Sequence, residues 1–342
     1  MEQNKKIFFW APMLGNVGTI KATINSIESI LDETNYKVYI LNTFGEFSFY
    51  ENKNINLKKL NIFTFLKFFP KTGMISKFFI YFFSFLSIPF LFFYIFKYKP
   101  NIIHSSLVGY IPLILKLFFN NLKVFNSIQG YPRFNFIRKL IWKNLYTKSD
   151  LIITMTENTK EKLIQNLGNI KNIKTIFNPI IDNKIYLKSE KQIDERFKKI
   201  FHNKTSFTSI GRLTRQKNYI ELLKAFEILQ KNFDTNFVRE NLSLSVIGEG
   251  EDLFKLKKFV KDQNILNVYF LGFQANPFNL LKRSNFYVSS SLWEDPGHTL
   301  IEAAALKVPI ITSDCPSGPK ELFNTNNSFV YKSGNYQQLS EI

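Results

Sequence analysis

Short apolar runs alternate with helix-length segments along almost the whole of this chain of 342 residues. Many of these runs are apolar at consecutive positions, as strands are when both faces of a sheet are covered. Strands that alternate with helices form parallel sheets, so we predict an α/β protein. The predicted strands are residues 7–11, 38–41, 101–104, 124–127, 151–155 and 175–177, followed by 207–210, 244–247, 268–271, 286–289 and 308–312.

The strands fall into two series, and each is long enough for a domain of ordinary size. The first series closes at Asn178-Pro179, after which the sequence becomes rich in charged residues before the next strand. We therefore predict a first domain over residues 1–180, a linker over 181–205 and a second domain over 206–342. The N-terminus resembles a signal peptide, but Pro12 interrupts its short apolar core, and we predict the first strand there.

The net charge of +18 comes from 45 basic and 27 acidic residues. Such an excess suits a polyanion, whether nucleic acid, anionic lipid or a phosphorylated substrate, and does not choose among them. The single cysteine, Cys315, excludes an internal disulfide, which fits a reducing compartment. The three histidines lie far apart and no Asp-x-Asp pair occurs, so the sequence predicts no metal site.

Two polar clusters in the second series suggest chemistry. One runs from Gly211 through Arg212 to Lys217 and places cations directly after a predicted strand. The other contains Glu294 and Glu302, with seven residues between them, at the start of a predicted helix. Carboxylates accept hydrogen bonds from sugar and ribose hydroxyls, and cations hold a diphosphate. A site for a nucleotide sugar needs both.

Five ordered motifs between residues 205 and 330 resemble the donor domain of family 4 (group 1) glycosyltransferases. They are Gly211-Arg-Leu-Thr-Arg-Gln-Lys-Asn, Val246-Ile-Gly-Glu-Gly, Phe270-Leu-Gly-Phe, the Glu294 and Glu302 pair, and Ser313-Asp-Cys-Pro-Ser-Gly-Pro-Lys-Glu. The resemblance implies a retaining enzyme with the GT-B fold, in which two Rossmann-like, doubly wound domains face a cleft. The N-terminal half resembles this family only in outline.

The resemblance also implies roles for individual residues. Arg212 and Lys217 would hold the donor pyrophosphate and offset the charge that grows on the leaving phosphate, whereas solvated surface charge is the plainer account. Glu302 would bind ribose, or serve only as an acid near a helix N-terminus. Glu294 would lie near the transferred sugar, and Phe273 beside the nucleobase. The expected catalytic set is Glu294, Arg212 and Lys217; the expected donor-binding set is Gly211, Arg212, Lys217, Phe273, Gly297, His298, Thr299 and Glu302.

Backbone N–H groups at Gly297, His298 and Thr299 would form an anion cradle at the start of the helix. Asp295-Pro296-Gly297 is a variant of the family pattern, and Pro296 has no N–H to contribute. We interpret His298 as part of the pocket wall rather than as a base.

On the acceptor side, Gly15, Asn16 and Gly18 follow the first strand, where glycine lets backbone approach a ligand closely. A plain turn accounts for them equally well. His104 lies at the end of a predicted strand. It is either a structural residue or a catalytic one. Gln129 stands where many relatives carry a histidine near the reaction centre. Because glutamine cannot act as a base, we predict that it orients the acceptor by hydrogen bonding.

Residues 78–96 contain no charge and nine phenylalanines. That length reaches the threshold for a membrane-spanning helix, but Pro89 interrupts it. Insertion into a membrane surface is the favoured interpretation, with a buried domain helix and a span as alternatives. Nearby basic residues suit an anionic membrane: Lys58, Lys59, Lys67, Lys71, Arg133, Arg138, Lys139 and Lys143.

We therefore expect a cytoplasmic glycosyltransferase, peripheral to the inner face of the cell membrane. It would move a hexose or N-acetylhexosamine from a nucleotide diphosphate sugar, UDP-linked, to a lipid-linked or surface-glycan acceptor. We expect no metal, no cofactor beyond the donor substrate, and no nucleic-acid partner. The alternatives are a sugar-nucleotide epimerase of GT-B architecture and a non-enzymatic basic protein that binds membrane or nucleic acid. The segment from Ser333 to Ile342 reads as the opening of a helix, so we also expect further residues after Ile342.

Overall fold

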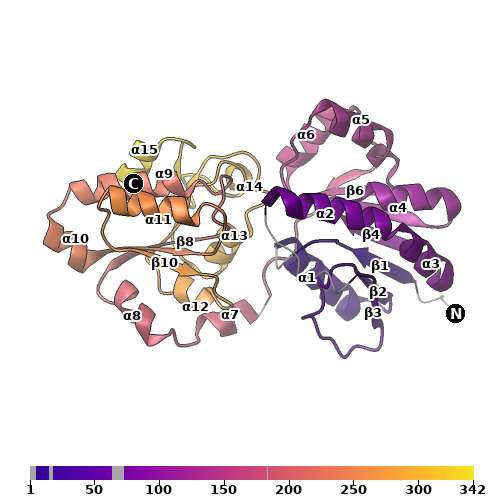
Figure 1. Cartoon of the computed structure of the whole chain (residues 1–342), viewed down its shortest axis with the longest axis horizontal. Helices are drawn as coiled ribbons and strands as arrows, with labels where there is room; N and C mark the ends of the chain where they lie inside the picture. The colour runs from indigo at the N-terminus through magenta and orange to yellow at the C-terminus, as the bar shows by residue number, and fades with distance from the viewer. Residues whose placement is uncertain (1–4, 15–17, 64–72, 183) are drawn as a thin grey trace. The chain divides into compact units, whose positions relative to one another are not determined.

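The computed structural model describes residues 5–14, 18–63, 73–182 and 184–342, without the side chains of residues 73–77 (Figure 1). The chain divides into two compact units, Met1–Ile180 and Ile181–Ile342. Each unit contains one sheet whose strand pairs are all parallel. The prediction of an α/β protein with two parallel sheets is confirmed.

The first unit has seven strands in the order β3-β2-β1-β4-β5-β6-β7. These strands are β1 (Lys6–Trp10), β2 (Lys37–Asn42), β3 (Leu57–Asn61), β4 (Ile102–Ser106), β5 (Lys123–Ile128), β6 (Leu151–Thr154) and β7 (Ile173–Thr175). Its helices are α1 (Gly18–Glu33), α2 (Gly73–Leu86), α3 (Ile88–Tyr98), α4 (Tyr110–Leu115), α5 (Phe136–Asn144) and α6 (Glu157–Leu167), with short 3-10 turns η2 (Lys116–Phe118) and η3 (Tyr146–Lys148).

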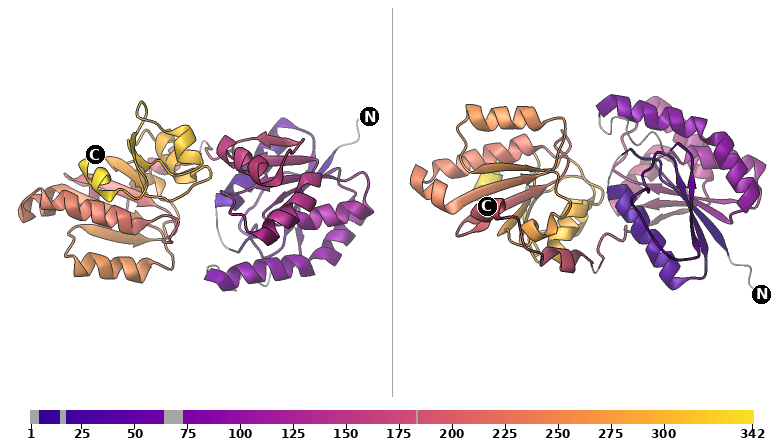
Figure 2. Two further views of the ribbon diagram at one scale, coloured as in Figure 1. Left: turned by 90° about the horizontal axis from the view of Figure 1, so that it is seen from above. Right: turned by 60° about the horizontal axis from the view of Figure 1, so that its bottom comes forward.

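Side chains alternate between the two faces of this sheet, and each face packs against different helices. Phe9 of β1 packs with Ile20 and Ile27 of α1. Phe8 points to the opposite face and belongs to a core that includes Leu91 of α3. Helices α1 and α2–α3 accordingly lie on opposite sides of the strands, as the right view of Figure 2 shows.

The second unit has six strands in the order β10-β9-β8-β11-β12-β13. They are β8 (Thr205–Ile210), β9 (Leu242–Ile247), β10 (Val268–Gly272), β11 (Phe286–Ser289), β12 (Ile310–Ser313) and β13 (Phe329–Tyr331). The helices are α7 (Lys184–Ser189), α8 (Glu195–Phe201), α9 (Tyr219–Lys231), α10 (Thr235–Asn241), α11 (Leu253–Asp262), α12 (Phe278–Leu281), α13 (His298–Ala305), α14 (Gly318–Leu322) and α15 (Tyr336–Glu341).

Helices α7 and α8 lie in the segment predicted as a linker. Ile185 of α7 packs with Phe278 of α12, and Phe197 of α8 packs against a cluster that includes Ile247 of β9. The segment therefore forms part of the core of the second unit.

Each predicted strand has a counterpart, but β3 and β13 were not predicted. Both are edge strands. The sequence of β3 is Leu-Lys-Lys-Leu-Asn, and β13 has only three residues. Edge strands are short and often carry lysine, so they do not form the continuous apolar runs on which the prediction depended.

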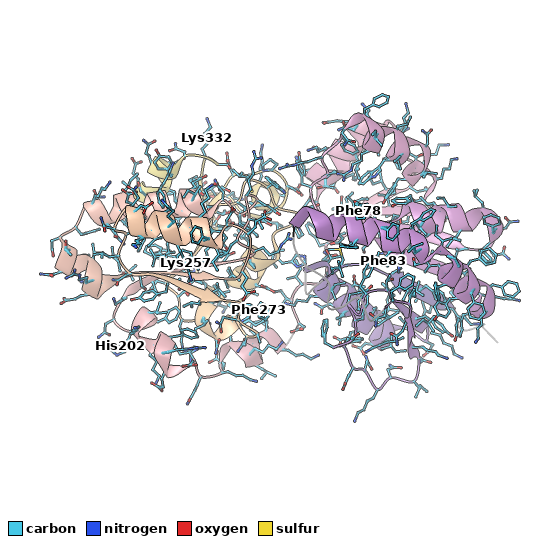
Figure 3. The ribbon with its side chains drawn as sticks, viewed as in Figure 1. Phe78, Phe83, His202, Lys257, Phe273 and Lys332 are labelled. Atoms are coloured by element: carbon cyan, nitrogen blue, oxygen red, sulfur yellow. The ribbon has the colours of Figure 1, made fainter. Side chains whose placement is uncertain are left out.

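The Phe-rich stretch forms most of α2 and α3, which are bent by 47° at a break at Ser87. Within the described residues, no single helix meets the length and hydropathy of a membrane span; only this bent pair does so jointly. One side of the pair packs on the sheet through Ile80, Leu91 and Ile95, with Phe83 partly buried beside them. Figure 3 shows Phe83 and the exposed Phe78 on α2.

The outer side of the pair, which we call the α2–α3 aromatic surface, is exposed. Its residues are Phe78, Tyr81, Phe82, Phe85, Leu86, Phe90, Phe92, Phe93 and Phe96. The stretch is therefore amphipathic in its packing, although almost every residue in it is apolar.

This packing predicts opposite effects for two nearby positions on α3. Leu91→Ala removes a fully buried side chain and should lower the free energy of unfolding by about 2–5 kcal/mol. Phe93→Ala alters an exposed residue and should change it by less than about 1 kcal/mol. Chemical denaturation followed by circular dichroism measures both, and equal losses would contradict the observed orientation of α3.

Candidate functional site

The order of the strands in the second unit indicates where a ligand binds. From β8 the chain winds through β9 to β10, then returns and winds through β11 and β12 to β13. The direction reverses between β8 and β11. In open α/β sheets, ligands bind beyond the carboxyl ends of the strands at such a switch point. The residues that follow β8 and β11 begin with Gly211 and Ser290, so the two predicted clusters occupy these two loops.

Three hydrogen bonds join the two loops directly. Ser290 Oγ donates to the carbonyl of Lys217 at 2.9 Å, and the backbone N–H of Leu292 donates to the carbonyl of Gln216 at 2.8 Å. The Gln216 side chain donates to the carbonyl of Trp293 at 2.9 Å. The loops therefore form one structure, although they lie more than seventy residues apart in sequence.

An ion pair lies at the centre of this structure. Lys217 Nζ is 2.5 Å from Glu294 Oε1, and the two side chains are 18% and 7% exposed. Ser291 Oγ donates to the same Oε1 at 2.5 Å. A buried carboxylate needs a charge partner and hydrogen bonds to offset its desolvation, and Glu294 has both. The two residues predicted to bind phosphate and sugar are thus direct partners.

A third loop, after β9, supports the first. A Cβ at Gly248 would lie 2.0 Å from the Gly211 carbonyl oxygen, and one at Gly250 would lie 2.3 Å from that of Leu213. The backbone N–H of Leu213 donates to the carbonyl of Glu249 at 2.9 Å. Only glycine permits this approach of backbone to backbone. Sequence reasoning assigned no role to these glycines, and the structure gives them a supporting one.

The loop after β12 supports the Glu294 loop in the same way. A Cβ at Gly318 would lie 1.6 Å from the Pro296 carbonyl oxygen. Ser317 Oγ donates to Asp295 Oδ1 at 3.0 Å, and the Glu294 N–H donates to the Pro316 carbonyl at 3.3 Å. The position of Glu294 therefore depends on residues that follow it by more than twenty positions.

Helix α13 begins where these loops meet. Gly297 precedes it with a φ of 95°, in the left-handed region that favours glycine. The N–H groups of His298 and Thr299 belong to the first turn, where a helix leaves its donors without partners inside the helix. The Thr299 hydroxyl accepts a hydrogen bond at 2.6 Å from Tyr287, whose pKa burial raises well above its ordinary value. Glu302, five residues into α13, is buried.

Two predicted donor residues are exposed to solvent. Arg212 follows β8, and Phe273 follows β10 (Figure 3). Both strands end at the same edge of the sheet, because all strand pairs in this sheet are parallel. Exposed side chains at this edge can contact a ligand bound beside the Lys217–Glu294 pair.

The predicted acceptor-side residues lie in the first unit. Gly15 and Asn16 are outside the described residues, and Gly18 is the first residue of α1. His104 lies within β4 rather than at its end. Its Nε2 is 2.6 Å from Ser127 Oγ, its ring meets Phe9 edge to face, and burial lowers its pKa to about 4. This is the environment of a neutral, packed strand residue.

Gln129 follows β5 and pairs with Asn178 through both side-chain amides, at 2.9 and 3.3 Å. Asn178 precedes the boundary between the two units. The amide of Gln129 therefore fixes the end of the first unit to the end of β5.

Sequence reasoning missed several residues that build the site: Gln216, Ser290, Ser291, Tyr287 and Gly318. The two serines that follow β11, Ser290 and Ser291, were a usable signal. Hydroxyl groups that follow a buried strand at a switch point can form hydrogen bonds with the backbone of the neighbouring loops. No local pattern indicates the role of Gly318, since the carbonyl it must avoid belongs to a distant loop.

The chain is similar to known glycosyltransferases. Residues 190–342 match a family model described as glycosyl transferases group 1. An uncharacterized glycosyltransferase of Methanocaldococcus jannaschii is 34% identical over 243 residues, which are 66% of this chain and 58% of that protein. A 4-alpha-N-acetylgalactosaminyltransferase of Campylobacter jejuni, named for a diphospho-undecaprenol-linked acceptor, is 29% identical over 240 residues, 67% of this chain and 59% of that protein.

The chain thus spans somewhat under three-fifths of the length of these two relatives. Among solved structures, Anabaena HepE in complex with UDP and glucose superposes with a TM-score of 0.75 at 16% identity, over 98% of this chain and 88% of that one. The fold is GT-B, as predicted. The second unit therefore resembles the group 1 glycosyl transferases, and relatives that match a larger part of the chain are named as glycosyltransferases.

The contact at Gly318 predicts a strong effect from one added methyl group. Gly318→Ala would force the loop after β12 away from Pro296, and the second unit should lose about 2 kcal/mol or more of stability. Gly334 is the matched control, because its φ is 90° but an added Cβ meets nothing within 4 Å. Gly334→Ala should cost only about 1 kcal/mol. Thermal unfolding measures both, and a Gly318→Ala protein as stable as the parent would contradict the contact.

The lowered pKa of His104 predicts a pH effect on stability. The folded pKa of about 4 lies below the ordinary 6.5, so the unfolded state binds the proton more readily. The His104 contribution is complete above pH 6.5 and is lost as the pH falls toward 4. Between pH 7.5 and 5 the free energy of unfolding should fall by about 2 kcal/mol from this residue. Chemical denaturation at both pH values measures this fall, which should be about 2 kcal/mol larger for the parent than for His104→Gln. If the free energy of unfolding of the two proteins changed identically with pH, the assignment would be wrong.

Proposed function

We propose that this protein is a retaining glycosyltransferase of family 4. It moves a hexose or N-acetylhexosamine from a UDP-linked donor to a lipid-linked or surface-glycan acceptor, without a metal. One observation carries the proposal: a buried lysine–glutamate pair joins the two loops at the switch point of the second sheet. The UDP bound by the structural neighbour HepE and the lipid-linked acceptor named for the Campylobacter jejuni relative support the choice of substrates.

The chemistry follows from how charge develops as the sugar leaves. Negative charge grows on the departing diphosphate, and positive charge grows at the anomeric carbon. Lys217 carries three N–H donors, one of which is directed to Glu294. The remaining donors and the exposed Arg212 can bind the diphosphate, and the first N–H groups of α13 add backbone donors. These fixed charges supply the stabilisation for which other transferases use a metal.

Glu294 performs two tasks in this proposal. It holds Lys217 in place before the donor arrives, and it lies where a sugar bound at the diphosphate would be. Within the part of the chain that the structure describes, both hydrogen bonds to its carboxylate go to Oε1. Oε2 can therefore accept a hydrogen bond from a sugar hydroxyl. Glu302 binds the ribose hydroxyls, and Phe273 lies against the base.

The acceptor proton goes to the leaving phosphate. Gln129 has no basic group, and the imidazole of His104 faces Ser127 inside the sheet. The acceptor hydroxyl attacks the anomeric carbon on the face that the diphosphate leaves, so the new bond forms on that face and the configuration is retained. The departing phosphate oxygen lies on the same face and takes the proton of the hydroxyl. The reaction needs no protein base in this form.

We also propose that the protein works in the cytoplasm, peripheral to the inner face of the membrane. A lipid-linked acceptor is confined to the bilayer, and the α2–α3 aromatic surface offers apolar side chains for contact with it. The binding of nucleic acid forms no part of this proposal.

Kinetics separate the roles of Lys217 and Glu302. Lys217→Ala removes a charge that matters most in the transition state, so turnover should fall about 100-fold or more. Glu302→Gln weakens contact with ribose, which does not change during the reaction, so the donor Michaelis constant should rise while turnover changes less. Steady-state assays with varied UDP-sugars, with and without EDTA, measure these effects and test the need for a metal.

One control separates catalysis from folding. Lys217→Ala leaves Glu294 buried without its cation, which should destabilise the second unit by about 3 kcal/mol. The double variant Lys217→Ala, Glu294→Gln removes that unpaired charge and should regain stability but not turnover. If the double variant regained turnover, Lys217 would be structural. A product with inverted anomeric configuration, or an epimerised UDP-sugar without transfer, would reject the proposed reaction.

A further inference from the structure

The positive charge of this protein is concentrated in one part of the chain. Residues 52–149 contain 15 lysines and arginines and no aspartate or glutamate. This run supplies 15 of the 18 net positive charges, and the rest of the chain is almost balanced. A run of 98 residues without an acid is far outside ordinary composition.

The acid-free run supplies four of the helices that cover one side of the first unit's sheet. It includes α2, α3, α4 and α5, and the sheet strands among them. Val124 and Ile128 of β5 point to the same side of the sheet. Val124 packs in the core with α3, and Ile128 packs in a cluster that Trp142 of α5 also contacts. Helices α3 and α5 therefore cover the same side, together with α6, which lies outside the run and carries Glu157 and Glu161. Helix α1 covers the other side and carries Glu28, Asp32 and Glu33.

Helix α5 exposes its apolar residues to solvent. Its sequence is Phe-Ile-Arg-Lys-Leu-Ile-Trp-Lys-Asn, and none of its residues is buried. Trp142 holds it to the unit by stacking on Tyr146 at 4.5 Å. Phe136, Ile137 and Leu140 are 83%, 67% and 53% exposed. The apolar stripe of this helix thus points away from the core.

The charged residues on α5 and in the segments that flank it are all positive. Arg138, Lys139 and Lys143 lie on α5, and Arg133 and Lys148 flank it. A helix with exposed apolar residues and a cationic border lies in the interface of a bilayer, with the apolar side in the acyl region and the cations at anionic headgroups. Exposed Phe, Ile and Leu would contribute nothing to contact with the backbone phosphates of a nucleic acid.

We propose that α5 is a membrane-contacting helix that inserts its apolar stripe, Phe136, Ile137, Leu140 and Ile141, into an anionic bilayer. It forms a second contact beside the α2–α3 aromatic surface. Two apolar contacts on one cationic face hold the first unit at the bilayer in a defined orientation, which one contact does not. The proposal goes beyond the proposed reaction, because lipid binding requires neither donor nor catalysis.

A fluorescent probe tests insertion directly. The single native cysteine, Cys315, is buried, so Leu140→Cys can be labelled selectively with an environment-sensitive dye. The control is Phe254→Cys, since Phe254 is 81% exposed on α11 of the second unit, which also carries Lys255, Lys257 and Lys258. Vesicles of phosphatidylglycerol and phosphatidylcholine should shift the emission at position 140 to the blue and leave position 254 unchanged. No shift at 140, or equal shifts at both, would overturn the proposal.

Sedimentation with the same vesicles measures the contribution to affinity. Ile137→Ser, Leu140→Ser should weaken binding about 10- to 100-fold, while the fold is retained because neither residue is buried. Lys139→Ser, Lys143→Ser should weaken binding about tenfold to anionic vesicles and much less to pure phosphatidylcholine. Phe254→Ser should bind as the parent does.

Three outcomes would reject this role for α5. Parental vesicle binding by the Ile137→Ser, Leu140→Ser variant would place all contact elsewhere, for example on the α2–α3 aromatic surface. Binding of duplex DNA or RNA but not of vesicles would assign the cationic face to nucleic acid. A dimer that the same variant converts to a monomer, without vesicle binding, would assign the stripe to a second copy. Each result is independent of whether the protein transfers sugar.

Discussion

The ion pair between Lys217 and Glu294 is the interaction on which the second unit's site depends. It joins loops from two strands that wind in opposite directions, and it is nearly removed from water. Such a pair is costly to desolvate, and its geometry must be fixed by neighbours if it is to persist. Ser291 donates to the carboxylate, Gln216 and Ser290 fix the loops, and the adjoining glycine contacts leave the backbone little freedom. Because such a pair contributes little net stability, the proposed diphosphate binding gives a reason for its presence.

The first unit has a different physical character. Its sheet is covered on one face by α1, which carries both signs of charge, and on the other mainly by helices from an acid-free run, together with α6. On this second face the apolar residues are divided between the core and the solvent. Leu91 and Ile95 pack on the sheet, while phenylalanines of the same helix, such as Phe93 and Phe96, are exposed. Such a surface suits an anionic bilayer, whose interior is nonpolar and whose headgroups are negative. The proposed lipid-linked acceptor would lie in the same bilayer.

The alternation of apolar runs with helix-length segments was sufficient to predict two parallel sheets, because buried strands must be apolar on both faces. It did not reveal β3, whose lysines are compatible with a strand at the edge of the sheet. It also did not assign α7 and α8 to the core of the second unit. The positions of Lys217 and Glu294 followed from the motifs, but their direct pairing did not, since the distance between two loops depends on the strand order. Helix α5 shows the same limit: its apolar stripe has the period of a helix that packs inward, and only the structure shows that the stripe is exposed.

The close backbone contacts at Gly211 with Gly248, and at Pro296 with Gly318, also limit how this site can change. A side chain added at Gly248 or at Gly318 would displace the backbone segment that faces it, so neither glycine can be substituted singly in a search for new donor preference. Residues whose side chains extend from the same loops into solvent, such as Arg212 and Phe273, carry no such restriction. A family built on this scaffold can therefore diversify its substrates at the exposed side chains while the backbone beneath them keeps one shape.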